Sequence, residues 1–411
     1  MRRGRLAMIV SVFPVRSETF IVSKAVELAA AGWDVHVVCQ RCDAALLAEL
    51  PARARSQLQR RVHASWPHRP RWYAALLAPL ALLRCLLVSP IRTVRFLTRG
   101  GSLRRLYLDA DLICLGPAII HFEFGPLAVG RIDLGRLLGA RTVVSFRGYD
   151  INYMGLEDPS YFSAIFRSAS AIHTLGEDLW TRAVRRGCPP DKPHALIPPA
   201  VDGAYFDPKE RRHDERVGSP QRPLRVLSVG RLEWKKGYEY GLEAVRALID
   251  QGVHAEYRII GSGEFHTATA YARHQLGLTE VVQLLGAQPP ERVREEMLWA
   301  DVLLHPAVSE GFGNAVLEAQ SMMLPVVCTT ADGLRENIAD GETGLLVPSR
   351  DPQALARAMA TLAHDQTARQ RMGVAGRRRA LERFRLSDQI AAFGALYESL
   401  LTSSETGPRA D

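Results

Sequence analysis

The chain has 411 residues, of which 47% are hydrophobic and 23% charged, and a formal net charge of +8. Single cores stop growing at roughly 250–300 residues, so this length predicts two domains. Six cysteines without regular spacing argue against a disulfide scaffold and indicate a reducing compartment. Cys39 and Cys42 form a C-x-x-C, but no second pair nearby completes a four-ligand zinc site.

The N-terminus carries three arginines followed by the apolar run Leu6–Phe13, which has the look of a signal peptide. The run is short, has no small-residue cleavage site and meets Arg16 and Glu18 at once. A first buried parallel strand accounts for it better, because such strands are unbroken apolar runs. We therefore expect this end to be kept and the protein to be cytoplasmic.

An arginine-rich segment spans residues 51–108 and holds twelve arginines and no acidic residue. Its apolar run 74–83 is too short to cross a bilayer. Arginines around such a run favour a helix that lies on an anionic membrane surface. A core helix with a solvated basic face is the alternative. Nucleic acid is a third possibility, but no recognised binding motif accompanies the charge.

Apolar runs alternate with helical patterns along the whole chain, which predicts mostly parallel sheets. In the first half the expected strands are Leu6–Phe13, Asp34–Cys39, Ala118–Phe122, Thr142–Phe146, Ala171–Thr174 and His194–Ile197. After a segment rich in proline and charge, the pattern restarts with expected strands Leu224–Val229, Glu256–Ile260, Val281–Leu285, Val302–His305 and Val326–Cys328. Two doubly wound α/β domains in succession imply a cleft between them, where ligands bind outside the carboxyl ends of the strands.

The stretch after the expected strand Val302–His305 carries two glutamates, Glu310 and Glu318, around a glycine-rich turn. Gly311, Phe312, Gly313 and Asn314 form that turn, and Asn314 begins a helix. Backbone N–H groups at such a turn suit an anion at the helix N-terminus. Each carboxylate can accept two hydroxyl donors. The layout therefore predicts a ligand with phosphate in the middle and hydroxyls at each end, such as a nucleotide sugar.

Cations for those phosphates come from the loop after the strand Leu224–Val229. Gly230 ends the strand, Arg231 follows it, and Lys236 comes before a further glycine. Arginine can bind a diphosphate bidentately, whereas lysine acts as a point charge. Gly261 and Gly263 follow the next strand, but a lone G-x-G is usually only a tight turn.

These motifs resemble the family-4 retaining glycosyltransferases of the GT-B fold, of the exopolysaccharide and colanic-acid type. The resemblance rests on the E-x7-E pair Glu310 and Glu318, on "GRL…KKG" and on "GETGLLVPSRDP", between about residues 224 and 352. In the first half, "FPVRSETFI" with Glu18 and "FRGYD" with Arg147 and Asp150 are similar to exopolysaccharide-type members. The fold expected is α/β GT-B, with two Rossmann-like doubly wound domains facing across a cleft.

The resemblance implies sugar transfer from a nucleoside diphosphate sugar with retention at the anomeric carbon. Glu310 would hold sugar hydroxyls and Glu318 the ribose hydroxyls, while the amides of Gly311–Asn314 would contact sugar and phosphate. Arg231 and Lys236 would stabilise the leaving diphosphate, so neither a cofactor nor a metal is expected. The D-x-D of Asp109 and Asp111 imitates a metal motif that the fold does not need.

Several positions depart from the family pattern. Arg147 stands where the family usually has histidine, and in "HFEFG" His121 is kept while Glu123 replaces a second histidine. We expect Arg147, Asp150, His121 and Glu18 on the acceptor side, where Arg147 could face an anionic acceptor such as a lipid diphosphate. Met323 and Asp332 replace two usual glycines and are expected to be tolerated packing changes, although Asp332 could alter the phosphate pocket.

The expected domains are an N-terminal acceptor domain at 1–200, a linker at 201–223, a donor domain at 224–385, and a C-terminal helix and tail at 386–411 that packs back on the N-terminal domain. The expected partners are a nucleotide-sugar donor, a glycan or lipid-linked glycan acceptor and an anionic membrane on the inner face of the plasma membrane, with no nucleic acid. Alternatives are a catalytically silent nucleotide-sugar-binding partner of an assembly complex, or an epimerase or phosphorylase on the same fold. An NAD-dependent oxidoreductase lacks its G-x-G-x-x-G after the first strand.

Overall fold

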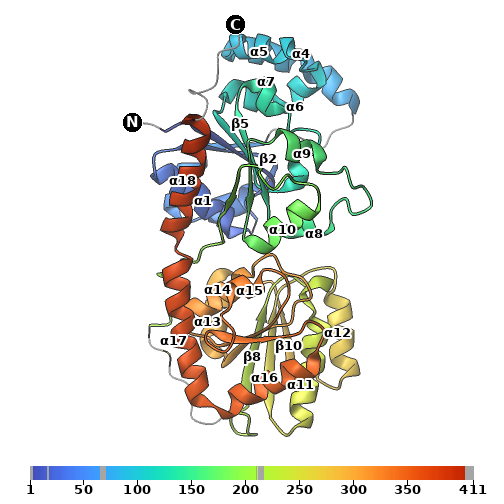
Figure 1. Ribbon diagram of the computed structural model, residues 1–411, viewed down its shortest axis with the longest axis vertical. Helices are drawn as coiled ribbons and strands as arrows, with labels where there is room; N and C mark the ends of the chain where they lie inside the picture. Colours follow the sequence, from blue (N-terminus) through green and yellow to red (C-terminus); the bar gives the residue numbers. More distant parts are fainter. Residues whose placement is uncertain (1–2, 16–17, 65–70, 210, 212–216, 403–411) are drawn as a thin grey trace. The chain divides into compact units, whose positions relative to one another are not determined.

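The computed structural model describes residues 3–15, 18–64, 71–209, 211 and 217–402, and of residues 71–75 it describes the backbone alone. Residues 65–70 of the arginine-rich segment, most of 210–216 in the expected linker and the tail 403–411 lie outside the described residues. The chain divides into two units, the first comprising residues 1–197 and 390–411 and the second residues 198–389. Figure 1 shows a layer of strands flanked by helices in each unit.

Unit 1 holds a parallel sheet of seven strands in the order β3-β2-β1-β4-β5-β6-β7. The strands are β1 Arg5–Phe13, β2 Asp34–Cys42, β3 Val62–Ala64, β4 Ile119–Phe122, β5 Arg141–Phe146, β6 Ala171–Thr174 and β7 His194–Leu196. Residues 6–10 of β1 are all buried, because helices cover both faces of a parallel sheet. The apolar N-terminal run is therefore an inner strand of unit 1, between β2 and β4.

The helices of unit 1 follow its strands in chain order. They are α1 Thr19–Ala30, α2 Ala44–Glu49, α3 Ala52–Leu58, α4 Arg71–Val88, α5 Pro90–Thr98, α6 Leu103–Leu115, α7 Leu134–Leu138, α8 Tyr149–Tyr153, α9 Ser163–Ser168 and α10 Glu177–Arg185, with the 3-10 turn η1 Gly125–Ala128. The arginine-rich segment thus forms α3, β3, α4, α5 and the start of α6. None of the helices in the described part of the chain combines the length and the apolar character needed to cross a membrane.

Unit 2 holds a parallel sheet of six strands in the order β10-β9-β8-β11-β12-β13. The strands are β8 Leu224–Val229, β9 Ala255–Ile260, β10 Val282–Gly286, β11 Val302–His305, β12 Val326–Thr329 and β13 Gly344–Val347. The helices are α11 Tyr238–Asp250, α12 His266–Gln275, α13 Pro290–Trp299, α14 Asn314–Ser321, α15 Leu334–Asn337, α16 Pro352–His364 and α17 Gln366–Arg383, with the 3-10 turn η2 Trp234–Lys236. Two buried apolar clusters cover the sheet.

The two ends of the expected linker belong to unit 2. Val201 forms a β-bridge with Arg385, and Val217 is buried in one of the apolar clusters of unit 2. Helix α18, Leu386–Thr402, begins in unit 2, and its residues from Ile390 onward belong to unit 1. Within unit 1 its Tyr397 is fully buried and its hydroxyl lies 2.6 Å from Nδ1 of His121.

Candidate functional site

The strand order of unit 2 places the predicted donor residues at one point of the sheet. The chain runs outward from β8 through β9 to β10, and then returns to the other side of β8 with β11. The carboxyl ends of β8 and β11 therefore mark the topological switch point, which is where open α/β sheets bind ligands. Lys236 follows β8 and Glu310 follows β11, so the two loops meet at this point.

Glu310 forms an ion pair with Lys236 and accepts a hydrogen bond from His305. The Lys236 Nζ contacts Oε2 of Glu310, and Nε2 of His305 lies 3.0 Å from the same oxygen. Burial of the Glu310 carboxyl disfavours its charge, but Lys236 and His305 outweigh this effect, and the pKa of Glu310 lies well below its usual value. The pKa of His305 is lowered, mainly because the imidazole is buried. The group at position 310 is therefore an ionised carboxylate held between two side chains from neighbouring strand ends.

The main chain of Glu310 is held separately by Asp332. The Oδ2 of Asp332 accepts a hydrogen bond from the Glu310 amide at 3.0 Å and another from the Ser309 hydroxyl. In return, the Gly333 amide donates to the Glu310 carbonyl at 3.2 Å. Asp332 has a φ of +44° and Met323 a φ of +54°, a backbone region that favours glycine. Both positions are those where the family resemblance leads us to expect glycine, and at Asp332 the carboxylate adds a loop contact that glycine lacks.

The glycine-rich turn leads into α14. Gly313 has a φ of +89° and caps the helix, and the side-chain amide of Asn337 donates to the carbonyls of Phe312 at 2.8 Å and Gly313 at 3.1 Å. The Phe312 side chain is buried and packs edge-on against Phe384, so only its main chain is left for a ligand. Asn314 is exposed at the first position of the helix.

Glu318 lies in the second turn of α14, and the residue is partly exposed. Desolvation of its carboxyl by burial raises the pKa to about 7. No cation is among the causes of this shift, in contrast to Glu310. The two glutamates of the E-x7-E pair therefore occupy different electrostatic environments. Glu310 is fully ionised at neutral pH, whereas Glu318 has a pKa close to neutral pH.

The remaining predicted donor residues lie on the loops after β8 and β9. Arg231 is exposed, and its guanidinium pairs with Glu233 at 2.7 Å, whereas Lys236 contacts Glu310 directly. A β-carbon at Gly261 would overlap the carbonyl of Gly230, and one at Gly263 would overlap the carbonyl of Leu232. These glycines therefore let the two loops pack together, which is a structural reason for the G-x-G that does not require a ligand.

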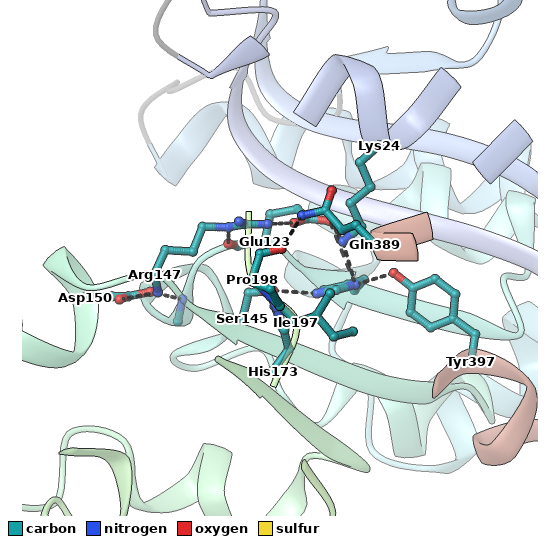
Figure 2. A network of polar contacts seen from close by, with 12 residues as sticks. Lys24, Glu123, Ser145, Arg147, Asp150, His173, Ile197, Pro198, Gln389 and Tyr397 are labelled. Carbon is teal, nitrogen blue, oxygen red and sulfur yellow. Dashed lines mark hydrogen bonds and ion pairs between the residues drawn. The ribbon is translucent and has the colours of Figure 1, made fainter. Parts of the chain in front are cut away.

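Unit 1 contains a buried ionic network at the carboxyl ends of its central strands (Figure 2). The Glu123 carboxylate receives Lys24 Nζ at 2.7 Å on one oxygen and Arg147 Nη2 at 2.6 Å on the other. The side chains of Lys24 and Glu123 are 2% and 0% exposed, and that of Arg147 is 12% exposed. Burial opposes ionisation of Glu123, yet His121, Lys24 and Arg147 together hold its pKa well below the usual value. Burial also lowers the pKa of Lys24 to about 8.

His121 and Asp150, expected on the acceptor side, are both buried in unit 1. His121 is fully buried and hydrogen bonded to Tyr397 at 2.6 Å and Ser145 at 2.7 Å. The Asp150 carboxylate, also buried, accepts backbone amides of its own loop at 2.9–3.1 Å and that of Gly125 at 3.2 Å. Asp150 thereby holds the loop of Arg147, while His121 joins β4 to Ser145 and to α18. The placement of both residues on the acceptor side stays a prediction. Glu18 is partly exposed and stands at the N-cap position of α1.

Among the residues that the structure describes, no group of three or more His, Cys, Asp or Glu side chains is arranged to hold a metal ion. Asp109 and Asp111 of the D-x-D lie on α6 and pair with Arg131 at 2.6 Å and Arg84 at 2.7 Å. Cys39 and Cys42 are free thiols on β2. The two aspartates of the D-x-D motif are therefore engaged in ion pairs.

Comparison with known proteins agrees with this geometry. Residues 209–379 match the family "Glycosyl transferases group 1". The chain carries a group 1 glycosyltransferase domain. This glycosyltransferase is 29% identical over 382 residues to the putative colanic acid biosynthesis glycosyltransferase WcaL of Salmonella typhimurium, covering 85% of this chain and 88% of the relative. It is 27% identical over 372 residues to the amylovoran biosynthesis glycosyltransferase AmsK of Erwinia amylovora, covering 86% and 89%.

Solved structures with a similar fold span nearly the whole glycosyltransferase. A glycosyltransferase from Rickettsia africae aligns with a TM-score of 0.74 at 15% identity, covering 98% of this chain and 99% of that one. HepE of Anabaena, solved with UDP-glucose, aligns with a TM-score of 0.72 at 16% identity, covering 97% and 100%. The glycosyltransferase has the GT-B fold, with one Rossmann-like sheet in each unit.

Among the side chains that hold these sites, His305, Glu233 and Lys24 were missing from the predicted set, whereas Asp332 was expected to alter the phosphate pocket but not to bind the Glu310 amide. His305 is the last residue of β11, and a polar side chain at a parallel strand end is a signal that the sequence does offer. Lys24 gave no such signal, since it lies in the middle of α1 and meets Glu123 only through the tertiary fold.

Proposed function

We propose that the protein is a retaining, metal-independent glycosyltransferase that moves a sugar from a nucleoside diphosphate sugar to a growing, lipid-linked cell-surface polysaccharide. The observation that carries the donor half is the Lys236–Glu310–His305 cluster at the switch point of unit 2. Support for the polysaccharide comes from WcaL and AmsK, whose names place them in colanic acid and amylovoran biosynthesis. Support for the donor class comes from HepE, which was solved with UDP-glucose.

In this proposal the donor lies across the carboxyl ends of β8 and β11. Lys236 and Arg231 bind the diphosphate and stabilise the charge that develops on it as the sugar leaves, which is the step where preorganised cations contribute most. Glu310 accepts hydrogen bonds from sugar hydroxyls. Glu318 accepts those of the ribose, and the amides of Gly311–Asn314 contact sugar and phosphate. The sugar passes through an oxocarbenium-like state, and the departing phosphate oxygen takes the proton of the acceptor hydroxyl.

The acceptor half of the proposal belongs to unit 1. Arg147 is the one member of the buried network whose side chain keeps exposed surface, and it lies over the rings of Phe20 and Phe124 at 4.5 and 5.8 Å. Lys24 and Arg147 carry two positive charges against the one negative charge of Glu123, so the network has a net positive charge. His121 and His173 do not add to this charge, because burial lowers their pKa and keeps them neutral. An anionic acceptor such as a lipid diphosphate fits this excess. An acceptor of that kind also requires the enzyme to work at the inner face of the plasma membrane.

The first test is a thermal-shift panel of UDP, GDP, ADP, dTDP and CMP on the wild type and on Glu318→Ala. A nucleotide present at about 100 times its dissociation constant adds about 2.7 kcal/mol of stability, which is easily seen. We expect one nucleotide to stabilise the wild type and to lose most of its effect in Glu318→Ala. Glu342→Ala is the matched control, because Glu342 is an exposed acid of the same unit, paired with Arg378.

Two results would count against the donor site. Equal stabilisation of the wild type and Glu318→Ala by the same nucleotide would show that it binds elsewhere. No stabilisation by any nucleotide, together with no release of nucleotide from donor sugars in the presence of membranes, would reject the assignment of the glutamate pair.

A further inference from the structure

An exposed apolar stripe runs along α4 and α5 of unit 1. Its members recur at helical spacing and all face solvent: Leu76, Leu80, Leu83, Leu87, Ile91 and Val94. Leu87 is 76% exposed and Ile91 75% exposed. Eight of the sixteen large hydrophobic side chains found exposed in the described part of the chain fall between residues 76 and 94. Exposed apolar residues gathered in this way indicate an interaction site.

The opposite side of the two helices explains why the stripe stays outside. Ala78, Cys85, Thr93 and Phe96 are buried. The Cys85 thiol contacts the Ala110 carbonyl of α6 at 3.8 Å, and the Ser89 hydroxyl donates to the Cys114 carbonyl at 3.2 Å. The helices are thus fixed on α6 through one face, and Figure 1 shows α4 and α5 together on the same side of unit 1 as α6. Rotation of the leucines into the core would expose this packed face.

Positive charge lies beside the stripe. Arg95, Arg99 and Arg136 cluster where α5 meets α7, since a β-carbon at Gly139 would lie 3.6 and 3.5 Å from the guanidinium groups of Arg95 and Arg99. Arg99 and Arg136 donate to each other's carbonyls at 2.6 and 2.7 Å. Within the described ranges, no acidic side chain pairs with these three arginines. An anion outside the chain would therefore neutralise them.

Two kinds of occupant fit an apolar stripe: a bilayer and a protein surface. Binding hot spots between proteins are enriched in Trp, Tyr and Arg, and leucine and valine are under-represented in them. The stripe is entirely aliphatic. Aliphatic side chains next to arginines, on a helix too short and too interrupted to cross a bilayer, are typical of a segment that lies in the membrane interface.

We propose that α4 and α5 are the membrane-docking surface of this enzyme, in which the stripe inserts its aliphatic side chains among the acyl chains and Arg95, Arg99 and Arg136 bind anionic lipid headgroups. This inference rests on the proposed function, in which the enzyme acts on a lipid-linked acceptor at a membrane. It adds the surface through which the enzyme binds that membrane. Each arginine near an anionic surface strengthens binding, and added salt weakens it.

The experiment is sedimentation of the full chain with vesicles in the absence of donor and acceptor. Vesicles of phosphatidylcholine alone are compared with vesicles containing about a third phosphatidylglycerol, a content that gives a strongly negative surface. We expect binding to the anionic vesicles, weakened by salt. Leu80→Gln with Leu87→Gln should weaken binding by about tenfold or more, because two leucine side chains that the bilayer would bury are lost. Arg95→Gln with Arg99→Gln should remove most of the preference for the anionic lipid.

Matched controls separate docking from general surface change. Leu156 is as exposed as Leu80, at 63%, and lies in the same unit outside the stripe, so Leu156→Gln should bind vesicles as the wild type does. Arg167 is an exposed arginine of α9, and Arg167→Gln is the control for charge. All variants should keep the wild-type melting temperature and nucleotide response. A variant that loses vesicle binding but keeps its nucleotide response has lost docking alone, whereas a wild type without any nucleotide response would contradict the proposed function instead.

Two outcomes would overturn the proposal. The leucine variant could sediment with anionic vesicles as well as the wild type does. Alternatively, analytical ultracentrifugation could show a dimer in the wild type that becomes a monomer in the leucine variant, with vesicle binding unchanged. The stripe would then be an interface between two copies of the chain.

Discussion

The carboxylate of Glu123 joins two cations that come from distant parts of unit 1. Arg147 Nη2 lies 2.6 Å from Oε2 and Lys24 Nζ lies 2.7 Å from Oε1. Positions 123 and 147 are the two at which the resemblance to family-4 glycosyltransferases leads us to expect histidine. In this chain the two side chains form a buried ion pair with each other.

The coupling predicts unequal effects of removing the two partners. Glu123→Gln leaves Lys24 and Arg147 buried without an anion, and breaking a buried pair in this way costs about 3–5 kcal/mol. Arg147→Gln leaves the Lys24–Glu123 pair intact and should cost less. In a denaturant titration, the double variant should be more stable than the sum of the two single losses by about 0.5–3 kcal/mol. Additive losses would show that the pair contributes no coupling.

Asp332 is predicted to position Glu310 at little net cost in stability. Asp332→Gly loses the carboxylate contacts to Ser309 and the Glu310 amide, but it relieves a non-glycine residue at a φ of +44° that costs on the order of 1 kcal/mol. We expect the melting temperature to change little and the kcat to fall by about tenfold or more.

Asp332→Asn is the conservative partner of that variant. It keeps an acceptor oxygen for the Glu310 amide, so it should restore most of the activity. A glycine variant with unchanged kcat, or an asparagine variant as weak as the glycine variant, would contradict the positioning role.

The donor unit was largely predictable from the sequence because its signals are local. Strand β8 is an unbroken apolar run ended by Gly230, and Glu310 follows a buried strand directly, so the sheet edge brings Lys236 and Glu310 together. The same local reasoning missed β3, which has only three residues, and Asp332, whose partner lies twenty-two positions earlier. At position 332 the sequence suggested a packing change or an altered phosphate pocket, because a single residue type does not reveal a contact between two loops.

The acceptor unit was less predictable, because its decisive contacts link distant residues. His121 resembles a family motif residue, yet its partner Tyr397 lies 276 positions later on α18. Lys24, in the middle of α1, gave no sign of its pairing with Glu123. The helix of the arginine-rich segment was expected, but the separation of its buried and exposed faces became visible only with α6 in place.

Substitution of Lys236 should reduce catalysis more than substitution of its neighbour Lys235. Lys236→Ala removes a cation proposed to bind the leaving diphosphate, and it leaves Glu310 with His305 alone, so the pKa of Glu310 should rise. We expect the kcat to fall by about 100-fold to 1,000-fold, as for loss of one preorganised donor at a developing charge. Lys235→Ala is the matched control, since its ammonium pairs with Glu233 at 3.1 Å.

The same substitution should change the response to acid. Glu310 has a depressed pKa in the folded protein, so it contributes stability above its ordinary pKa of about 4.5, and this contribution is lost as the pH falls. In Lys236→Ala that contribution is smaller, so the loss of stability on acidification should be shallower than in the wild type.

Equal kcat values for Lys236→Ala and Lys235→Ala would argue against a specific catalytic role for Lys236.

The raised pKa of Glu318 predicts a pH dependence of stability with the opposite sign to that of Glu310. Its pKa is raised from about 4.5 to about 7, so the folded protein binds a proton that the unfolded chain releases between these values. The stabilisation is fully present below about pH 4.5 and is lost as the pH rises through about 7, amounting to about 3 kcal/mol at most. Glu318→Gln stays neutral at every pH, so its stability should fall less over this window in a denaturant titration.

Nucleotide binding should depend on the same proton. The ionised carboxylate is the form that accepts two ribose hydroxyls, and its fraction rises about tenfold between about pH 6 and about pH 8 for a pKa of about 7. The affinity of the nucleotide that stabilises the wild type should therefore rise by up to about tenfold over this range. The phosphate of the nucleotide also titrates nearby, but that component is shared by Glu318→Gln. The difference between the two proteins isolates the carboxylate, and equal pH profiles would mean that Glu318 does not contact the nucleotide.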